Sequence, residues 1–412
     1  MRRYFSIFII VVFVFFGTNI VFAEETGAFT LDEVKEMALK NSRALKTMEQ
    51  VIKEIDANSS IAYNAYNSAY YGGYINSMNS QSALLPLIAT KKSELGALTE
   101  GSPEWQALKM EIQALEMQAA QNQMSAGSGL SASRQAKKTW EDLEDRLTDT
   151  KRAYEDLNKQ IEFSVEQLYT SALLLEEQIN IAEKNYEYLL DLLGVERLRG
   201  QLGMTTSVDI DRLAVQTSDL NKGIRQMRDS LIVVKERIND IIGRDVKSNL
   251  ELVKFDVDVP LVSIINMEPI IEKTLENMAS IPQQERDIEK LRKDLDDIDG
   301  SNEKAIQKAK IEQALLALDD TKQNIRNSVN TLVSDMQSKA KAFQLAEITF
   351  KNAQKTYEWE RIKFELGMIS KLQFENSKIA YLDAQNKKTT AGYDYFLAKR
   401  LVELAEQGIL VM

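Results

Sequence analysis

The chain has 412 residues, of which 27% are charged, and a formal net charge of −11, with neither cysteine nor histidine. This composition excludes thiol nucleophiles, disulfides, Ser-His-Asp triads and zinc sites built on cysteine or histidine. Phosphate repels an acidic protein, so the chain is a poor nucleic-acid binder and we expect no nucleic-acid partner. The acidic residues are scattered along the chain and are typical of solvated helix faces. We therefore expect no enzyme, no catalytic residues, no metal site and no cofactor.

The N-terminus has the pattern of an export signal. Arg2 and Arg3 precede an apolar run from Tyr4 to Phe16, and Val21-Phe22-Ala23 fits a cleavage site. We expect a signal peptide over 1–23 and an exported mature chain without a transmembrane helix. Cleavage of the signal peptide removes two arginines, so the net charge of −11 becomes −13. The alternative is an uncleaved membrane anchor, for which the apolar run is short.

The rest of the chain predicts long helices. Glycine (17) and proline (5) are scarce, and proline is absent between Glu104 and Val259 and again after Gln283. A Gly/Ser-rich segment at 125–133 predicts a break between helices.

Residues 61–90 are the one stretch that could hold a strand or touch a membrane. The five tyrosines there either form a membrane-interface cluster or pack at the far end of helical hairpins. They are Tyr63, Tyr66, Tyr70, Tyr71 and Tyr74.

Apolar residues further along keep coiled-coil spacing. Two sets of residues seven apart run through 161–193, and steps of four and three continue through 220–241. A weaker version of the same pattern covers 329–357. Narrow apolar stripes of this kind are the seams of helices that pack on other helices.

The chain also contains an internal duplication. GQLGMTTSVD (200–209) and FELGMISKLQ (364–373) align at an offset of 164, and the register holds over about forty residues. A weaker echo relates 29–45 to 265–281 at an offset of 236, which leaves about 72 extra residues in the first half. We expect a first repeat over 24–260 with an insertion at about 60–132, and a second repeat over 261–412.

Each copy of the repeated motif predicts a helix end, a tight turn and a helix start. A glycine suits the left-handed position just past a helix, and a hydroxyl residue three positions later is a good N-cap. A basic residue before the glycine complements the negative helix end, and an acid or amide after the cap resembles a capping box. These residues are Arg199, Gly203, Met204, Thr206 and Asp209 in the first copy, and Lys363, Gly367, Met368, Ser370 and Gln373 in the second.

The predicted fold is all-α, with internally duplicated long antiparallel helical hairpins, coiled-coil packing and little or no β-structure. This arrangement resembles the TolC family of outer-membrane efflux proteins, whose tips read basic-x-x-x-Gly-x-x-Ser/Thr-x-x-Asp. All four pattern positions match in the first copy, whereas Gln373 replaces the acid in the second. The segment FTLDEVKEMALKNSRALK resembles the opening of the mature family members.

The resemblance implies a homotrimer that forms a channel-tunnel in the cell envelope, at the outer membrane or in the periplasm. It also implies that the two tips dock a periplasmic adaptor (membrane-fusion) protein, which links the channel to an inner-membrane pump. Met204 and Met368 are the best candidates for contact, because apolar residues at an exposed turn stabilise nothing in a lone hairpin. The glycine, serine and threonine residues can be explained by the turn alone.

The sequence departs from the family in one respect. Family members insert two β-strands into each half, and no segment here has the alternation of about ten residues that such strands need. The chain therefore resembles a relative without the barrel strands, which either serves a cell with one membrane or reaches an outer membrane through its insertion.

We expect a channel-tunnel component of an efflux or type I export system. The rival hypothesis is an exported coiled-coil envelope scaffold or interaction protein that conducts nothing.

Overall fold

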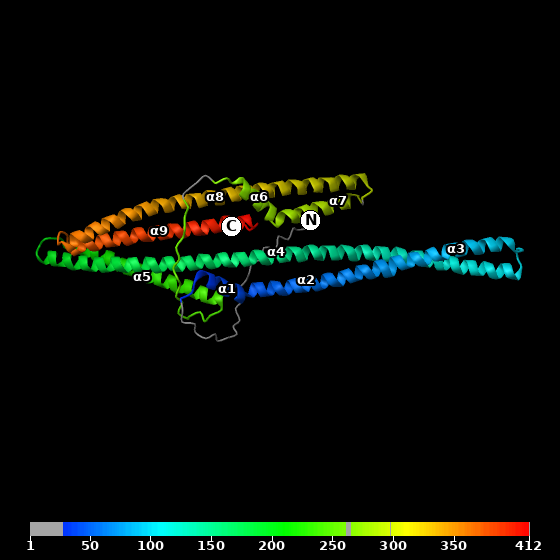
Figure 1. Cartoon of the computed structure of the whole chain (residues 1–412), viewed down its shortest axis with the longest axis horizontal. Helices are drawn as coiled ribbons and strands as arrows, with labels where there is room; N and C mark the ends of the chain where they lie inside the picture. The colour runs from blue at the N-terminus through cyan, green and yellow to red at the C-terminus, as the bar shows by residue number, and fades with distance from the viewer. Residues whose placement is uncertain (1–27, 261–264, 297, 412) are drawn as a thin grey trace.

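The computed structural model describes residues 28–260, 265–296 and 298–411, and the predicted signal peptide lies outside them. The molecule is long and narrow, with its main helices along the long axis (Figure 1). Within the described residues, β-structure amounts to one isolated bridge between Phe29 and Leu252. The prediction of an all-α fold built from long hairpins is confirmed.

The first half is organised around one very long helix. Its helices are α1 (Leu31–Asn41), α2 (Arg43–Asn67), the π-helix η1 (Ser68–Ile75), α3 (Asn76–Ala97), α4 (Pro103–Gln201) and α5 (Ser207–Ile242). Helix α4 has 99 residues, which at 1.5 Å per residue extend about 150 Å. Its N-terminal part pairs with α2, η1 and α3, and its C-terminal part pairs with α5 (Figure 1).

The second half follows the same path on a shorter scale. Its helices are α6 (Glu268–Asn277), α7 (Ser280–Asp296), α8 (Ser301–Glu365) and α9 (Lys371–Glu406). Helix α8 pairs with α7 near its start and with α9 along the rest of its length (Figure 1). The α7–α8 turn stops well short of the end that α3 and α4 reach (Figure 1).

The predicted break at 125–133 is wrong, because α4 runs through this segment without interruption. Ala126, Gly129 and Ser133 are buried there, and α4 contacts both α2 and η1. Their small side chains let a neighbouring helix approach closely. The segment therefore serves helix packing, although its composition is that of a loop.

The alternative of a strand within 61–90 is also wrong, because α2, η1 and α3 make this stretch helical. Its tyrosines stack on one another and on α4. Tyr63 and Tyr66 lie 5.1 and 6.3 Å from the ring of Trp140, and Tyr70 lies 5.8 Å from both Tyr66 and Tyr74. These contacts support the packing role that we considered for the tyrosines.

The helices bury or partly bury the residues that the seam pattern picks out. Val165, Ala172, Ile179, Leu189 and Leu193 of α4 are all buried. Among the described residues, no helix combines the length and the apolar character that a membrane crossing requires.

Candidate docking tips and the junction between the halves

The first tip lies between α4 and α5. Gly203 has φ +72°, the left-handed conformation that glycine adopts at little cost. The backbone N–H of Met204 donates to the carbonyl of Arg199 at 2.8 Å, and that of Gly203 donates to Gly200 at 3.0 Å. This pair of bonds is a Schellman motif, which satisfies carbonyl groups left free at the helix end.

The next helix then begins at its predicted cap. The Thr206 hydroxyl accepts from the backbone N–H of Asp209 at 3.2 Å and lies 2.6 Å from the Asp209 carboxylate. A negative charge in the first turn of α5 is favourable next to the positive helix end.

The second tip repeats this geometry between α8 and α9. Gly367 has φ +70°, and the N–H of Met368 donates to the carbonyl of Lys363 at 2.8 Å. Ser370 and Gln373 form a complete capping box, in which the Ser370 hydroxyl accepts from the N–H of Gln373 and the Gln373 amide accepts from the N–H of Ser370. The predicted turn chemistry of both motifs is confirmed.

The basic residues before the two turns are also equivalent. Arg199 pairs with Glu196 at 2.8 Å, and Lys363 pairs with Glu360 at the same distance. Each cation is therefore held beside the negative end of its helix by an acid one turn earlier.

The structure brings the two tips to the same end of the molecule (Figure 1). Lys371, the first residue of α9, pairs with Asp191 of α4 at 2.8 Å, which links the two hairpins. The hydrogen bond from Lys371 to Asp191 raises the pKa of Lys371.

Apolar side chains are exposed at both tips. Met204 is 65% exposed and Met368 is 69% exposed, and Leu202 and Leu366 beside them are similarly open. Neither pair contributes to the interior of its own hairpin. The tips thus present apolar surface on turns whose shape is fixed by their own hydrogen bonds.

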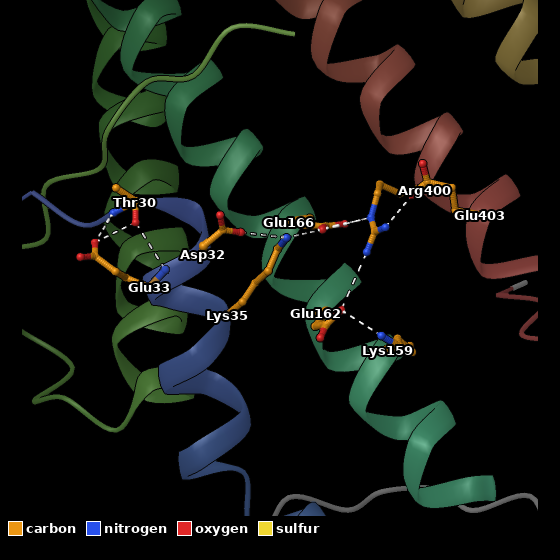
Figure 2. A network of polar contacts seen from close by, with 9 residues as sticks. All are labelled: Thr30, Asp32, Glu33, Lys35, Lys159, Glu162, Glu166, Arg400 and Glu403. Carbon is orange, nitrogen blue, oxygen red and sulfur yellow. Dashed lines mark hydrogen bonds and ion pairs between the residues drawn. The ribbon is translucent and has the colours of Figure 1, made fainter. Parts of the chain in front are cut away.

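A buried ionic network, which the sequence gave no reason to expect, joins the two halves midway along the molecule. Glu166 of α4 is fully buried and accepts from Arg400 Nε of α9 at 3.0 and 3.1 Å. Lys35 Nζ of α1 lies 2.8 Å from the same carboxylate. Figure 2 shows the two cations reaching Glu166 from different helices, with Glu403 next to Arg400.

Arg400 pairs with the carboxylates of Glu166 and Glu403 in this network. Burial alone lowers the pKa of Arg400, but the hydrogen bond to Glu403 and the charge of Glu166 outweigh it and raise the pKa above its ordinary value. Both cations reach the same buried carboxylate, so the junction depends on Glu166.

A second junction clamps the chain ends of the first half onto α4. The Tyr169 hydroxyl lies 2.7 Å from the carbonyl oxygens of both Phe29 and Val253. Phe29 and Val253 also bond to each other through the backbone at 2.9 Å. Burial raises the pKa of Tyr169 to about 12.

Comparison with known families matches one segment of the chain. Residues 291–405 match the model of the family described as outer membrane efflux protein. The matched segment lies within the second half and is less than a third of the chain. No curated protein matches the chain in sequence.

Solved structures extend this resemblance to the fold of the whole described chain. The outer-membrane channel OprN aligns with a TM-score of 0.56 and 11% identity, covering 92% of this chain and 90% of its own. The CmeC outer membrane channel of Campylobacter jejuni aligns with a TM-score of 0.51 and 14% identity, covering 92% and 85%. CusC aligns with a TM-score of 0.53 and 11% identity, covering 92% and 95%.

At these identities the likeness concerns the fold. The expected resemblance to the TolC family is confirmed, by the sequence of the efflux protein domain and by the fold of both halves. The matched family consists of efflux channels rather than enzymes.

Proposed function

We propose that the chain is a channel-tunnel subunit of an efflux or type I export system in the cell envelope. Three copies would form the tube, with a periplasmic adaptor protein docked at the tips and an inner-membrane pump behind it. The observation that carries this proposal is an open layer of four helices whose outer edges are apolar.

The layer follows from the helix contacts. Helix α5 packs on α4, α4 packs on α9, and α9 packs on α8, so that α5 and α8 lie at opposite edges (Figure 1). A layer with two different edges joins to further copies head to tail, and such contacts close into a ring when the rotation allows it.

Both edges expose large apolar residues. On α8, Phe343 and Tyr357 face α9. Leu345 and Trp359 follow them by two positions, respectively, and a step of two positions turns a side chain to the opposite side of a helix. Leu345 and Trp359 therefore point away from α9. The exposed edge residues are Val208, Val215, Ile232 and Val233 on α5, and Leu345, Ile348, Trp359 and Ile362 on α8. Water contact of so many apolar residues along two edges favours association.

The mass of the mature protein in light scattering tests the ring. We expect the mass of three chains, and we expect Leu345→Glu with Trp359→Glu to reduce it to that of one chain. Glu358→Lys, an exposed change on the same helix, should leave the mass unchanged. A single-chain mass for the unaltered protein would instead favour the coiled-coil scaffold that conducts nothing.

Docking at the tips needs a test that preserves the turns. Met204→Glu with Met368→Glu places charge on exposed side chains and leaves the glycines and caps in place. We expect cells with this variant to lose resistance to a panel of dyes and antibiotics, while the mass of the assembly stays the same. Val246→Glu, an exposed change in the loop after α5, is the control. Full resistance with both methionines replaced would contradict docking at the tips.

A further inference from the structure

A stretch near the end of the molecule opposite the tips differs from the rest of the chain in its lack of charge, whereas the hairpin end itself, residues 91–116, carries eight charged residues. Residues 57–90 and 117–133 contain no Asp, Glu, Lys or Arg, in a chain of which 27% is charged. We call these two segments together the uncharged arm. They belong to α2, η1 and α3 on one side and to α4 on the other.

The structure places the two segments against each other. The backbones of η1 and α4 meet at Gly73 and Gly129, so closely that a Cβ on Gly129 would lie 2.6 Å from the backbone nitrogen of Tyr74. Ion pairs stand just outside this region, with Lys91 and Glu111 at 2.7 Å and Lys92 and Glu116 at 2.6 Å. The absence of charge is therefore shared by two helices that are adjacent in space and distant in sequence.

Each of these helices also carries an apolar stripe that its own hairpin leaves exposed. On α3 the stripe contains Met78 and Leu85, seven residues apart, and on α4 it contains Met110, Met117 and Met124, also seven apart. The hairpin itself is closed by other residues, namely Ile88, Ile112 and Ala119. A repeat of seven is the spacing by which one helix packs along another.

Two exposed stripes on different helices of one hairpin can be covered by two different neighbouring chains. A member of a closed ring has one neighbour on each side and contacts them through different surfaces. The stripes are thus complementary to each other in successive copies, α3 of one copy meeting α4 of the next.

Charge identifies a second copy as the occupant. Copies of a chain with net charge −11 repel each other over most of their surface, and the uncharged arm is where they approach without repulsion. Lipid fits the same surface less well, because Gln118, Gln121 and Gln123 are exposed beside the methionines and amides are costly to place in hydrocarbon.

We propose that the uncharged arms of neighbouring copies pack on each other, the α3 stripe of one against the α4 stripe of the next, and form a helical collar near the end opposite the tips, just inside the charged hairpin end. The arrangement rests on the proposed ring, which sets all arms at the same end. Neighbouring α3 and α4 helices then run antiparallel between copies, as they do within one copy.

Cysteine pairs test this contact without background, because the chain contains no cysteine. Leu85 and Met117 lie at the same level of the arm, since each is six residues from the Lys91–Glu111 ion pair. Chains with Leu85→Cys and differently tagged chains with Met117→Cys are produced together and oxidised. We expect a mixed disulfide dimer at about tenfold the yield of the control, because a disulfide requires Cα atoms within about 7 Å.

The control uses Gln118→Cys in place of Met117→Cys, because Gln118 is the next residue in the sequence and is also exposed. Its side chain points about 100° away around the helix. Equal yields from both pairs, or no mixed dimer from either, would overturn the proposal. Binding to vesicles of phosphatidylethanolamine and phosphatidylglycerol that Met117→Gln with Met124→Gln abolishes, without any mixed disulfide, would assign the surface to lipid and also overturn it.

Failure of the collar and failure of the ring give different results. If the unaltered protein has the mass of three chains but forms no mixed disulfide, the ring stands and the collar is wrong. If the mixed disulfide forms although Leu345→Glu with Trp359→Glu has no effect on the mass, the arms associate and the proposed edge contact is wrong.

Discussion

Replacement of Glu166 by glutamine should destabilise the protein more than any other single change to a charge described above. The carboxylate is fully buried, with Lys35 Nζ at 2.8 Å and Arg400 Nε at 3.0 Å. The Lys35 and Arg400 side chains are only 19% and 22% exposed. Glutamine keeps the size of the side chain but leaves two largely buried cations without their shared anion.

The size of the effect follows from what each cation retains. Removal of one partner from a buried ion pair costs about 3–5 kcal/mol. Arg400 keeps Glu403 at 2.6 Å, whereas Lys35 keeps the more distant Asp32 at 3.5 Å, whose side chain is 94% exposed. We therefore expect the lower end, about 3 kcal/mol, or about 1 M in the urea midpoint for an m-value near 3 kcal/mol per molar.

Urea unfolding followed by circular dichroism measures this difference. Asp32→Asn is the control, because it removes an exposed carboxylate from the same lysine and should change stability by less than about 0.5 kcal/mol. Replacement of all three groups, by Glu166→Leu, Lys35→Met and Arg400→Met, should recover most of the loss, since a buried ionic cluster often equals an apolar one in stability. If Glu166→Gln matches the unaltered protein within about 0.5 kcal/mol, the reasoning from the buried charge is refuted.

Three further predictions concern the turns and the clamp. Gly203→Ala should destabilise the protein by about 1 kcal/mol, because Gly203 has a positive φ. Gly223→Ala should stabilise it by about 0.5–1 kcal/mol, because Gly223 lies within a helix. A Cβ meets nothing within 4 Å at either position, so equal effects of the two changes in thermal unfolding would contradict this. Ser370→Ala should cost about 1 kcal/mol through loss of the capping box, and retained stability in urea would show that the box is dispensable. The folded-state pKa of Tyr169, about 12, is above the ordinary value near 10. The contribution of the buried neutral hydroxyl to the free energy of unfolding is therefore complete below pH 10 and is lost as the pH rises to 12. Relative to Tyr169→Phe, the protein should lose about 2–3 kcal/mol of stability over that range, and parallel pH profiles of the two proteins would contradict this.

The features that the sequence predicted well are those encoded within a few residues. The two tips depend on a glycine, a cap and the residue three positions later, and all of these interactions are local. The buried seam of α4 depends on a seven-residue period that continues over many turns. Both kinds of signal survive in a single sequence because no distant contact is needed to interpret them.

The features that it missed depend on contacts between distant segments. Gly129 and its neighbours have the composition of a loop, but they are part of α4 and their small size matches the close approach of η1. Glu166 is one glutamate among many along α4, and its role depends on Arg400, 234 positions later. The outer position of α5 and α8 likewise follows from the order of helices in space.

The link between Lys371 and Asp191 has a consequence for the shape of the rim. Asp191 lies twelve residues before Gly203, whereas Lys371 lies only four residues after Gly367, so the first tip projects beyond the second by on the order of 10 Å. Figure 1 shows the same stagger at the tip end. A ring of such subunits would have a toothed edge, in which each tall hairpin is followed by a short one. A partner that seals against this edge must fit both the projecting α4–α5 turns and the shorter α8–α9 turns between them. The shape of the edge would therefore fix the angular position of the partner on the ring before any side chain is recognised.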